Sequence, residues 1–479
     1  MRLPAAILLL RAALAAAACQ HVPPAPLMPA RTAAAYQARA LDSPDLHAFL
    51  TAASGHAPAE WPLRTWDLRT LALAALYFHP DLDVVRAHAD VAAAAIATAG
   101  ARPNPTLSIA PQLVANPESG VSPWLTTVNF DWPIETAGKR ARRIEHADAG
   151  AAAAREAVVV EAWRVRRELA TAVVALAAAT RERDALDDEV ALDERLLALV
   201  EGRQREGAAA ANDVTPLRLA LLQARSDRAA AAARVGDARA HVAAALGVPA
   251  AALDGIRLPQ GLDADDAQAL LGVATADARR RALLERADVR QALAEYVAAE
   301  ATLRLELARQ YPDLRLGPSY EFDQGLNKWG FVLALDLPIM NRNEGPIGEA
   351  VAARAEAAAK VVAAQAHVIA EIEAATARRD GERARSATMH ALTAERDANV
   401  GRVATAVRAG AADRVAELGA EVESRRARRS AAEAESALAQ ALVDVEAAME
   451  GPLPPAALDR KTIPPSGDVA SAGAPGRNR

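Results

Sequence analysis

The sequence predicts a mainly α-helical protein with a small β part, in which a long antiparallel coiled coil is joined to four strands. Alanine, glutamate and arginine are abundant and aromatic residues make up only 3% of the chain, which is typical of long helices packed through small side chains. Two stretches alternate strictly between apolar and polar residues, as half-buried strands do. The whole pattern occurs twice, because Asp131-Trp132-Pro133-Ile134 is matched later by Asp336-Leu337-Pro338-Ile339, which indicates two internal repeats.

The start of the chain has the features of an export signal. Arg2 supplies a positive charge, and two apolar runs separated by Arg11 end in small residues before Cys19. We therefore predict a signal peptide over residues 1–18. The sequence LAAAACQ resembles a lipoprotein signal, so we expect Cys19 to be acylated; the alternative is a cysteine that lies near the cleavage site by chance. Cys19 is the only cysteine, which excludes an intrachain disulfide.

The segments that flank the repeats are rich in proline and alanine. We predict a lipidated, extended N-terminal arm at residues 19–65 and a disordered tail at 451–479. The formal charge of −6 and the alternation of arginine with acidic residues give no sign of a nucleic-acid partner. After residue 18, nothing approaches the roughly 20 uncharged apolar residues of a membrane helix. Any membrane crossing is therefore expected to use strands.

The two repeats have the same predicted organisation. Repeat 1 spans 66–250 and contains a helix, a β-hairpin at 104–134, a long helix at 138–207 and a returning helix at 213–247. After an equatorial linker at 251–283, repeat 2 spans 284–450, with a hairpin at 312–339, a long helix at 345–409 and a returning helix at 413–449. Each long helix is about 100 Å long at 1.5 Å per residue, and its heptad spacing indicates coiled-coil packing. A plain soluble helical bundle would show the same heptads.

The two hairpins carry the aromatic residues and the charges on opposite faces. On the apolar face, predicted to contact lipid, lie Trp124, Phe130, Trp132, Tyr320, Phe322, Trp329 and Phe331. On the polar face, predicted to line a water-filled lumen, lie Asn129, Arg315, Glu321, Asp323, Lys328 and Asp336. This is the pattern of transmembrane β-hairpins, although a half-buried hairpin of a soluble sheet shares it. Four strands cannot close in a membrane, where open edges leave backbone groups unpaired. Two subunits would supply eight strands, and three would supply twelve and leave room for a pore.

At this point the chain resembles the TolC-like outer-membrane efflux proteins. The resemblance covers about residues 66–450 and is carried by the duplicated unit, LPIMNRNEG after the last strand, the turn segments EGAAAANDVTPLRLALLQA and AGAADRVAEL, and LGVP. It implies a homotrimer with a twelve-stranded transmembrane β-barrel above a coiled-coil α-barrel, in the outer membrane with the helical tube in the periplasm. It also implies a lipid anchor on Cys19 and docking to a periplasmic adaptor and an inner-membrane pump of the RND type. The segment NRNEG is most similar to a CzcC-like branch that confers heavy-metal resistance.

The turns between long and returning helices are the predicted periplasmic tips. We expect adaptor contacts at Gly207, Asn212, Asp213, Gly410 and Asp413. Asp413, Glu417 and Glu421 share one stripe of a helix and are the candidate gate, since three subunits would form acidic rings. The alternative is a helix N-cap with acids in the first turns. The aspartate gate of some relatives does not map here, because Ala416 and Gly419 occupy the matching positions.

The sequence contains no recognisable catalytic motif, and its nine histidines are scattered, with none paired at metal-ligand spacing. We therefore predict no enzymatic activity, no cofactor and no metal site. The leading hypothesis is a passive exit duct of a tripartite efflux system; the alternatives are a periplasmic adaptor and a coiled-coil scaffold without transport. Drugs, other small molecules, polypeptides and metal cations all remain open as substrates, with cations favoured by the resemblance alone.

Overall fold

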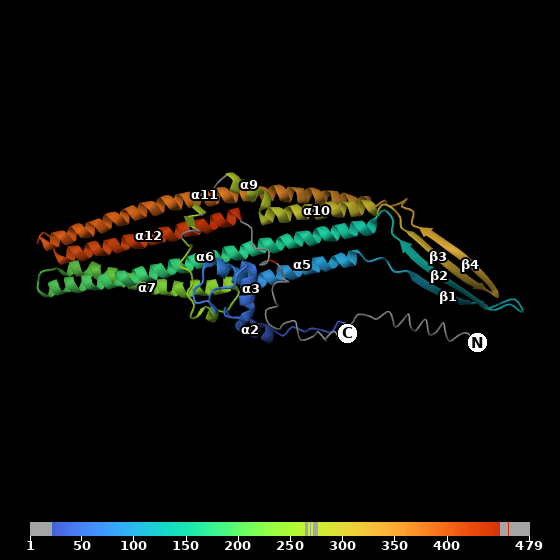
Figure 1. The fold of residues 1–479 in the computed structure, drawn as a ribbon, viewed down its shortest axis with the longest axis horizontal. Helices are drawn as coiled ribbons and strands as arrows, with labels where there is room; N and C mark the ends of the chain where they lie inside the picture. The colour runs from blue at the N-terminus through green and yellow to red at the C-terminus, as the bar shows by residue number, and fades with distance from the viewer. Residues whose placement is uncertain (1–21, 264–266, 269, 272–275, 451–457, 459–479) are drawn as a thin grey trace.

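A computed structural model describes residues 22–263, 267–268, 270–271, 276–450 and 458. The predicted signal peptide and Cys19 lie outside these residues, as does the 451–479 tail apart from residue 458. The molecule is a long rod with helices along most of its length and a β-sheet at one end (Figure 1). Among the described residues, no helix combines the length and the apolar character needed to cross a bilayer.

The N-terminal segment is folded, which corrects the prediction of an extended arm. It contains α2 (Pro29–Gln37) and α3 (Pro44–Ser54), and Leu46, Phe49 and Leu50 of α3 are buried. Both helices begin with proline. A proline in the first helical turn loses no hydrogen bond and has a preformed φ, so these prolines start helices.

The first helix of repeat 1 is divided into α4 (Leu68–Phe78) and α5 (Pro80–Ala99). The sequence suggests one continuous helix over the segment of α4 and α5. Pro80 lacks the backbone N–H that the helix would need, and it holds His79 in an extended conformation with ψ 121°. In repeat 2, α10 (Ala287–Ala308) is preceded by α9 (Ala276–Glu285), which occupies part of the predicted linker.

The sheet has four antiparallel strands in the order β1-β2-β3-β4. They are β1 (Thr106–Leu113), β2 (Trp124–Ile134), β3 (Leu314–Asp323) and β4 (Leu326–Leu335). The two hairpins, about 200 residues apart in sequence, are joined through β2 and β3. The β3–β4 turn is shorter than predicted, because only Gln324 and Gly325 connect the strands and both have positive φ, as two-residue hairpin loops require.

Four helices form the far end of the rod. The long α6 (Lys139–Arg205) returns as α7 (Ala211–Leu246), and the long α11 (Glu344–Arg408) returns as α12 (Arg414–Met449). Helix α6 contacts α7 and α12 there, and α12 contacts α11. Nearer the sheet, α6 contacts α5 and α10, and α10 contacts α11. In both the tip half and the sheet half of the rod, the helices therefore form one layer, in which α6 has a neighbour on each side and α11 lies at an edge (Figure 1).

The largest apolar core lies at mid-height, where α3, α4, α6 and α7 meet. It includes the 3₁₀ turn Ala250–Leu253, and the following linker segment pairs with the chain before α4 through a Thr65–Arg257 bridge. A second cluster near the tips joins α6, α7 and α12, and a third joins α9, α11 and α12. The predicted equatorial linker thus takes part in the core.

Candidate functional site

The strand register places all the aromatic side chains of the sheet on one face. Val128 pairs with Tyr320, Trp132 with Leu316, and Tyr320 with Trp329. Since paired residues point to the same side of a sheet, the predicted lipid-facing set of seven aromatics shares that face. Trp329 is 79% exposed and its ring lies 4.9 Å from the ring of Tyr320. The subunit thus presents a broad, uncovered apolar surface at one end.

The opposite face carries charges that pair across strands. Lys328 Nζ lies 2.6 Å from Asp323 and 3.3 Å from Glu321. Arg315 lies 3.6 Å from Asp131, a residue that the predicted lumen set did not include. Asn129 pairs with Ser319 on this face, whereas Asp336 lies just beyond the end of β4. The predicted polar set is therefore brought together on one face, apart from Asp336.

Gly317 allows β2 and β3 to approach. A Cβ atom there would lie 1.4 Å from the carbonyl oxygen of Phe130, so a larger residue would push the hairpins apart. Because this contact joins strands of different repeats, Gly317 is a requirement of the four-stranded sheet that alternation alone did not reveal.

The sheet is open at β1 and β4, and the helical layer is open on the same two sides. Each strand is followed or preceded by a helix: α5 leads to β1, β2 to α6, α10 to β3, and β4 to α11. The strand order β1-β2-β3-β4 therefore matches the helix order α5-α6-α10-α11. One side of the subunit is formed by α5 and β1, and the other by α11 and β4.

Polar contacts fix the sheet to the helices. Lys139, at the start of α6, donates from Nζ to Asp313 over 2.7 Å, and the backbone N–H of Thr136 donates to the same carboxylate over 2.9 Å. Arg143 bonds Glu135 and the carbonyl oxygens of Ala99 and Ala101. These bonds connect residues from both repeats at the base of the sheet, and the sequence had not singled them out.

At the far end of the rod, Asp413 ties the two helical hairpins together. Its side chain accepts a hydrogen bond from the backbone N–H of Ala416, as an N-cap, and its Oδ2 lies 2.6 Å from Arg203 of α6. The hydrogen bond from Arg203 lowers the pKa of Asp413. The N-cap alternative for Asp413 is therefore observed. Of the other candidate gate residues, Glu417 pairs with Arg414 over 2.6 Å and Glu421 lies one turn further along α12.

The remaining predicted tip residues lie in or beside the two turns. Gly207 and Gly410 have φ of +78° and +73°, the left-handed conformation that ends helices. Asp213 accepts a hydrogen bond from the backbone N–H of Ala210, and α7 begins at Ala211, so Asn212 and Asp213 lie in its first turn. The predicted start of this helix was two residues late. All five adaptor candidates thus lie at one end of the rod.

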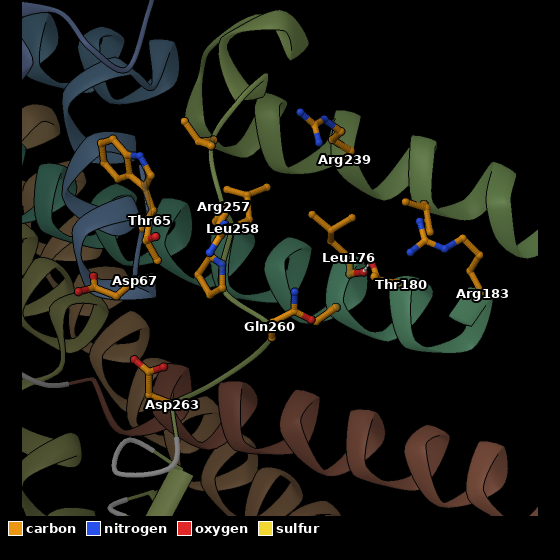
Figure 2. Close-up of a pocket in the computed structure, with 15 residues that line it drawn as sticks. Thr65, Asp67, Leu176, Thr180, Arg183, Arg239, Arg257, Leu258, Gln260 and Asp263 are labelled. Carbon is orange, nitrogen blue, oxygen red and sulfur yellow. Dashed lines mark hydrogen bonds between the residues drawn. The ribbon is translucent and has the colours of Figure 1, made fainter. Parts of the chain in front are cut away.

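An open groove of about 850 Å³ lies at mid-height between α6, α7 and the linker (Figure 2). Arg183, Arg239 and Arg257 line it together with Trp66 and Leu176. Two of these arginines are already engaged: Arg239 donates to Leu253 O and Asp254, and Arg183 donates to Asp184. Much of the positive charge in the groove is therefore neutralised within the chain.

The fold defines a class of protein that combines a coiled-coil rod with an amphipathic sheet whose two edges are open. Residues 71–248 match the model of the outer membrane efflux protein family, which confirms the resemblance seen in the sequence. No curated protein matches the chain significantly.

Solved structures of outer-membrane proteins share this fold. VceC of Vibrio cholerae is 20% identical with a TM-score of 0.65, over 81% of this chain and 96% of that one. OprN is 18% identical with a TM-score of 0.64, over 91% and 100%, and CusC is 19% identical with a TM-score of 0.63, over 87% and 99%. The predicted mainly α fold with a four-stranded antiparallel sheet is confirmed. The prediction that the chain is not an enzyme agrees with these comparisons, because the matched family is one of efflux proteins and CusC and OprN are described as channels.

Proposed function

We propose that this chain is one of three identical subunits of a passive exit duct, which crosses the outer membrane as a twelve-stranded β-barrel and extends into the periplasm as a helical tube. The observation that carries the proposal is the sheet with one continuous apolar face and open edges at β1 and β4. In a membrane those edges require partners, and β4 of one copy paired with β1 of the next supplies them. Signal cleavage before Cys19 and its acylation belong to the same proposal.

The helical layer supports the same association. Helix α11 carries Val351, Ala355, Ala358, Val362 and Ile369 in an exposed row with four-three-four-seven spacing. This is a coiled-coil seam without a partner among the described helices. On the other side, Val84 and Val91 of α5 are exposed seven residues apart. In a head-to-tail ring, each copy places one of these unlike surfaces against the other surface of the next copy. The ring closes if the rotation that relates neighbouring copies adds up to a full turn.

The polar face of the sheet would then line the lumen, with Lys328, Glu321, Asp323, Arg315, Asn129 and Asp336 in contact with water. At the other end, Gly207, Asn212, Asp213, Gly410 and Asp413 would contact a periplasmic adaptor that couples the duct to an inner-membrane pump. Asp413, Glu417 and Glu421 are the candidate gate, since the Arg203–Asp413 pair holds the two hairpins of each subunit together. We favour heavy-metal cations as substrate, on the similarity of NRNEG to the CzcC-like branch.

Cross-linking and conductance test the proposal. Within one chain β1 and β4 are separated by β2 and β3, so cysteine pairs placed one in each strand can be linked only between copies. We expect cross-linked trimers from outer-membrane detergent extracts, native mass spectra at the trimer mass, and ion conductance in planar bilayers. A water-soluble monomer with no membrane association would refute the duct. Trimers that do not conduct would favour the scaffold alternative.

A further inference from the structure

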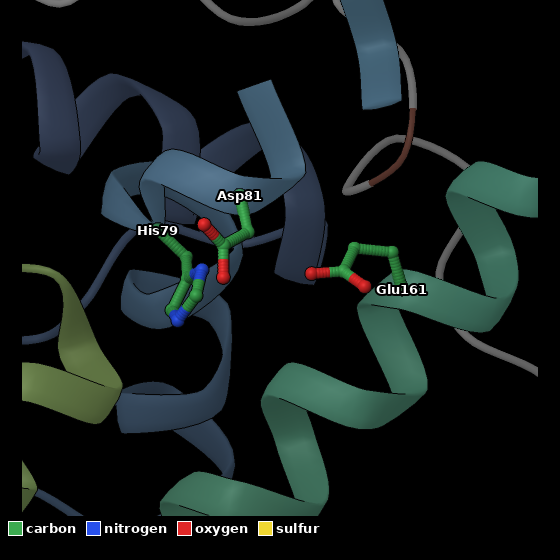
Figure 3. A group of neighbouring side chains, drawn as sticks. All are labelled: His79, Asp81 and Glu161. Carbon is green, nitrogen blue, oxygen red and sulfur yellow. The ribbon is translucent and has the colours of Figure 1, made fainter. Parts of the chain in front are cut away.

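Three side chains that are distant in the sequence meet at mid-height. His79 precedes α5, Asp81 lies in the first turn of α5, and Glu161 lies on α6. One potential ligand atom from each lies within 4.8 Å of the other two. Figure 3 shows a ring nitrogen of His79 facing the Asp81 carboxylate, with Glu161 reaching toward both from α6. The scattered histidines of the sequence gave no sign of this cluster.

The Nδ1 atom of His79 is buried and has no hydrogen-bond partner among the described residues, and His79 as a whole is only 6% exposed. Leaving a buried polar atom unpaired is unfavourable, so an unpaired nitrogen beside two carboxylates is a candidate ligand for a cation. Burial lowers the pKa of His79, and neutral imidazole is the form in which histidine binds metals.

A guanidinium already forms ion pairs with the two carboxylates. Arg164 Nη2 lies 2.8 Å from Asp81 and 2.5 Å from Glu161, while its Nη1 lies 2.5 Å from Glu168. This arrangement satisfies both acids but not the imidazole. A metal cation would bond all three, and Glu168 would keep Arg164 paired after its displacement.

We propose that His79, Asp81 and Glu161 bind a divalent transition-metal cation of the zinc class, in competition with Arg164. One imidazole nitrogen and two carboxylate oxygens suit Zn²⁺, Co²⁺ or Ni²⁺, and leave a position for water. Tetrahedral zinc needs its donors about 3.3 Å apart, so the three side chains must close slightly on the ion. The bound ion would tie the α4–α5 turn to α6. All ligands come from one subunit, so the site does not depend on the proposed duct.

Metal titration of the full chain in detergent, after treatment with a chelator, tests the site. We expect Zn²⁺ binding by calorimetry, a Co²⁺ ligand-field spectrum that Zn²⁺ abolishes, and little competition from excess Mg²⁺. Asp81→Asn and Glu161→Gln should each weaken Zn²⁺ binding by at least about tenfold. Arg164→Gln should tighten it, because the competing guanidinium is gone. The Co²⁺ ligand-field spectrum reports directly coordinated ligands and therefore distinguishes the site from general attraction to surface acids.

His390→Gln is the matched control, since His390 also lies beside a carboxylate, 3.0 Å from Glu435, but outside the cluster. Its Zn²⁺ affinity should equal that of the unaltered protein. Because His79 is buried, the Zn²⁺ affinity of His79→Gln is interpreted only together with a thermal unfolding measurement that shows whether the variant folds. Asp81 is exposed, so Asp81→Asn is expected to retain the fold. Unchanged affinity in Asp81→Asn and Glu161→Gln, equal competition by Mg²⁺, or weaker binding in Arg164→Gln would each overturn the proposal.

Discussion

Helices α6 and α11 occupy equivalent places in the two halves of the chain, yet only α6 is a core helix. They contain 67 and 65 residues. Helix α6 has neighbours on both sides, whereas the main contacts of α11 among the described residues are with α9, α10 and α12. Composition does not explain the difference, because α11 is not the more polar helix. The apolar seam left exposed on this edge helix is the surface that the next copy would cover in the proposed duct.

The two helices also differ in how much apolar packing holds them. The apolar residues of α6 enter the large equatorial cluster, including Val165 and Leu169. Helix α11 packs against α9 and α12 through a smaller apolar cluster that includes Val368 and Ile372, and it makes exposed ion pairs with α12, among them Asp397 with Arg428 and His390 with Glu435. Exposed ion pairs contribute little to stability, whereas buried apolar side chains contribute much. Truncations in the two helices should therefore have unequal effects.

The largest effect is expected from Leu169→Ala in α6. Leu169 is fully buried, so its truncation should lower the free energy of unfolding by about 2–5 kcal/mol. The matched change in α11, Leu392→Ala, removes a side chain that is 41% exposed and should cost less than about 1 kcal/mol. Denaturant unfolding followed by circular dichroism compares them. Equal losses would contradict the contrast between the helices.

The second largest effect should be a pH dependence of stability, which arises where α11 contacts α10 and α12. Glu450 is held near Arg286, Asp288 and Glu371, and its burial raises its pKa to about 7. In the unfolded chain its pKa is near 4.5. The folded protein then holds the proton more tightly, so stability falls as pH rises from about 4.5 to about 7 and stays low above.

Glu450→Gln should remove that slope, since glutamine can still accept the hydrogen bond that the backbone N–H of Ala287 donates to Glu450. At pH 8 the variant should be more stable by about 3 kcal/mol, and at pH 4 it should equal the parent. Thermal unfolding across this pH range measures the difference. A parallel shift at every pH would assign the effect to packing instead.

Changing the exposed seam should affect assembly and leave the subunit fold intact. Val362 is 66% exposed, so Val362→Glu should leave the circular dichroism spectrum unchanged. If α11 packs against the next subunit, the buried charge should abolish the trimer in native mass spectrometry. Val362→Thr, a change of similar size without charge, serves as the control. Full trimer formation by the glutamate variant would show that the seam is not an interface.

The smallest change in stability is expected at the tip. Arg203→Gln removes an exposed ion pair with Asp413, and unfolding should not change measurably. If the pair helps to hold the tube closed, single-channel conductance in planar bilayers should nevertheless increase. Because the pKa of Asp413 is lowered by Arg203, the parent pair should persist in mild acid and loosen only when Asp413 is protonated. An unaltered conductance would remove Asp413 from the gate.

Local pattern was sufficient where the chain repeats a simple rule. Two-residue alternation predicted the strands and the faces on which Trp329 and Lys328 lie, and heptads predicted helices as long as α6 and α11. Local pattern failed where one residue type is compatible with two structures. The prolines at 29 and 44 suggest an extended arm by composition, but in the structure they begin helices. The sequence around Pro80 suggests one continuous helix, but Pro80 separates α4 from α5.

What the sequence determined by itself was the set of elements and the polarity of their faces, because these depend on neighbours three, four or two residues away. Only the tertiary structure decided which faces find a partner within the chain. The union of the hairpins through β2 and β3, the edge position of α11 and the meeting of His79 with Glu161 all join residues far apart in the sequence. Such contacts depend on how whole helices and strands stack, which no short window of residues specifies.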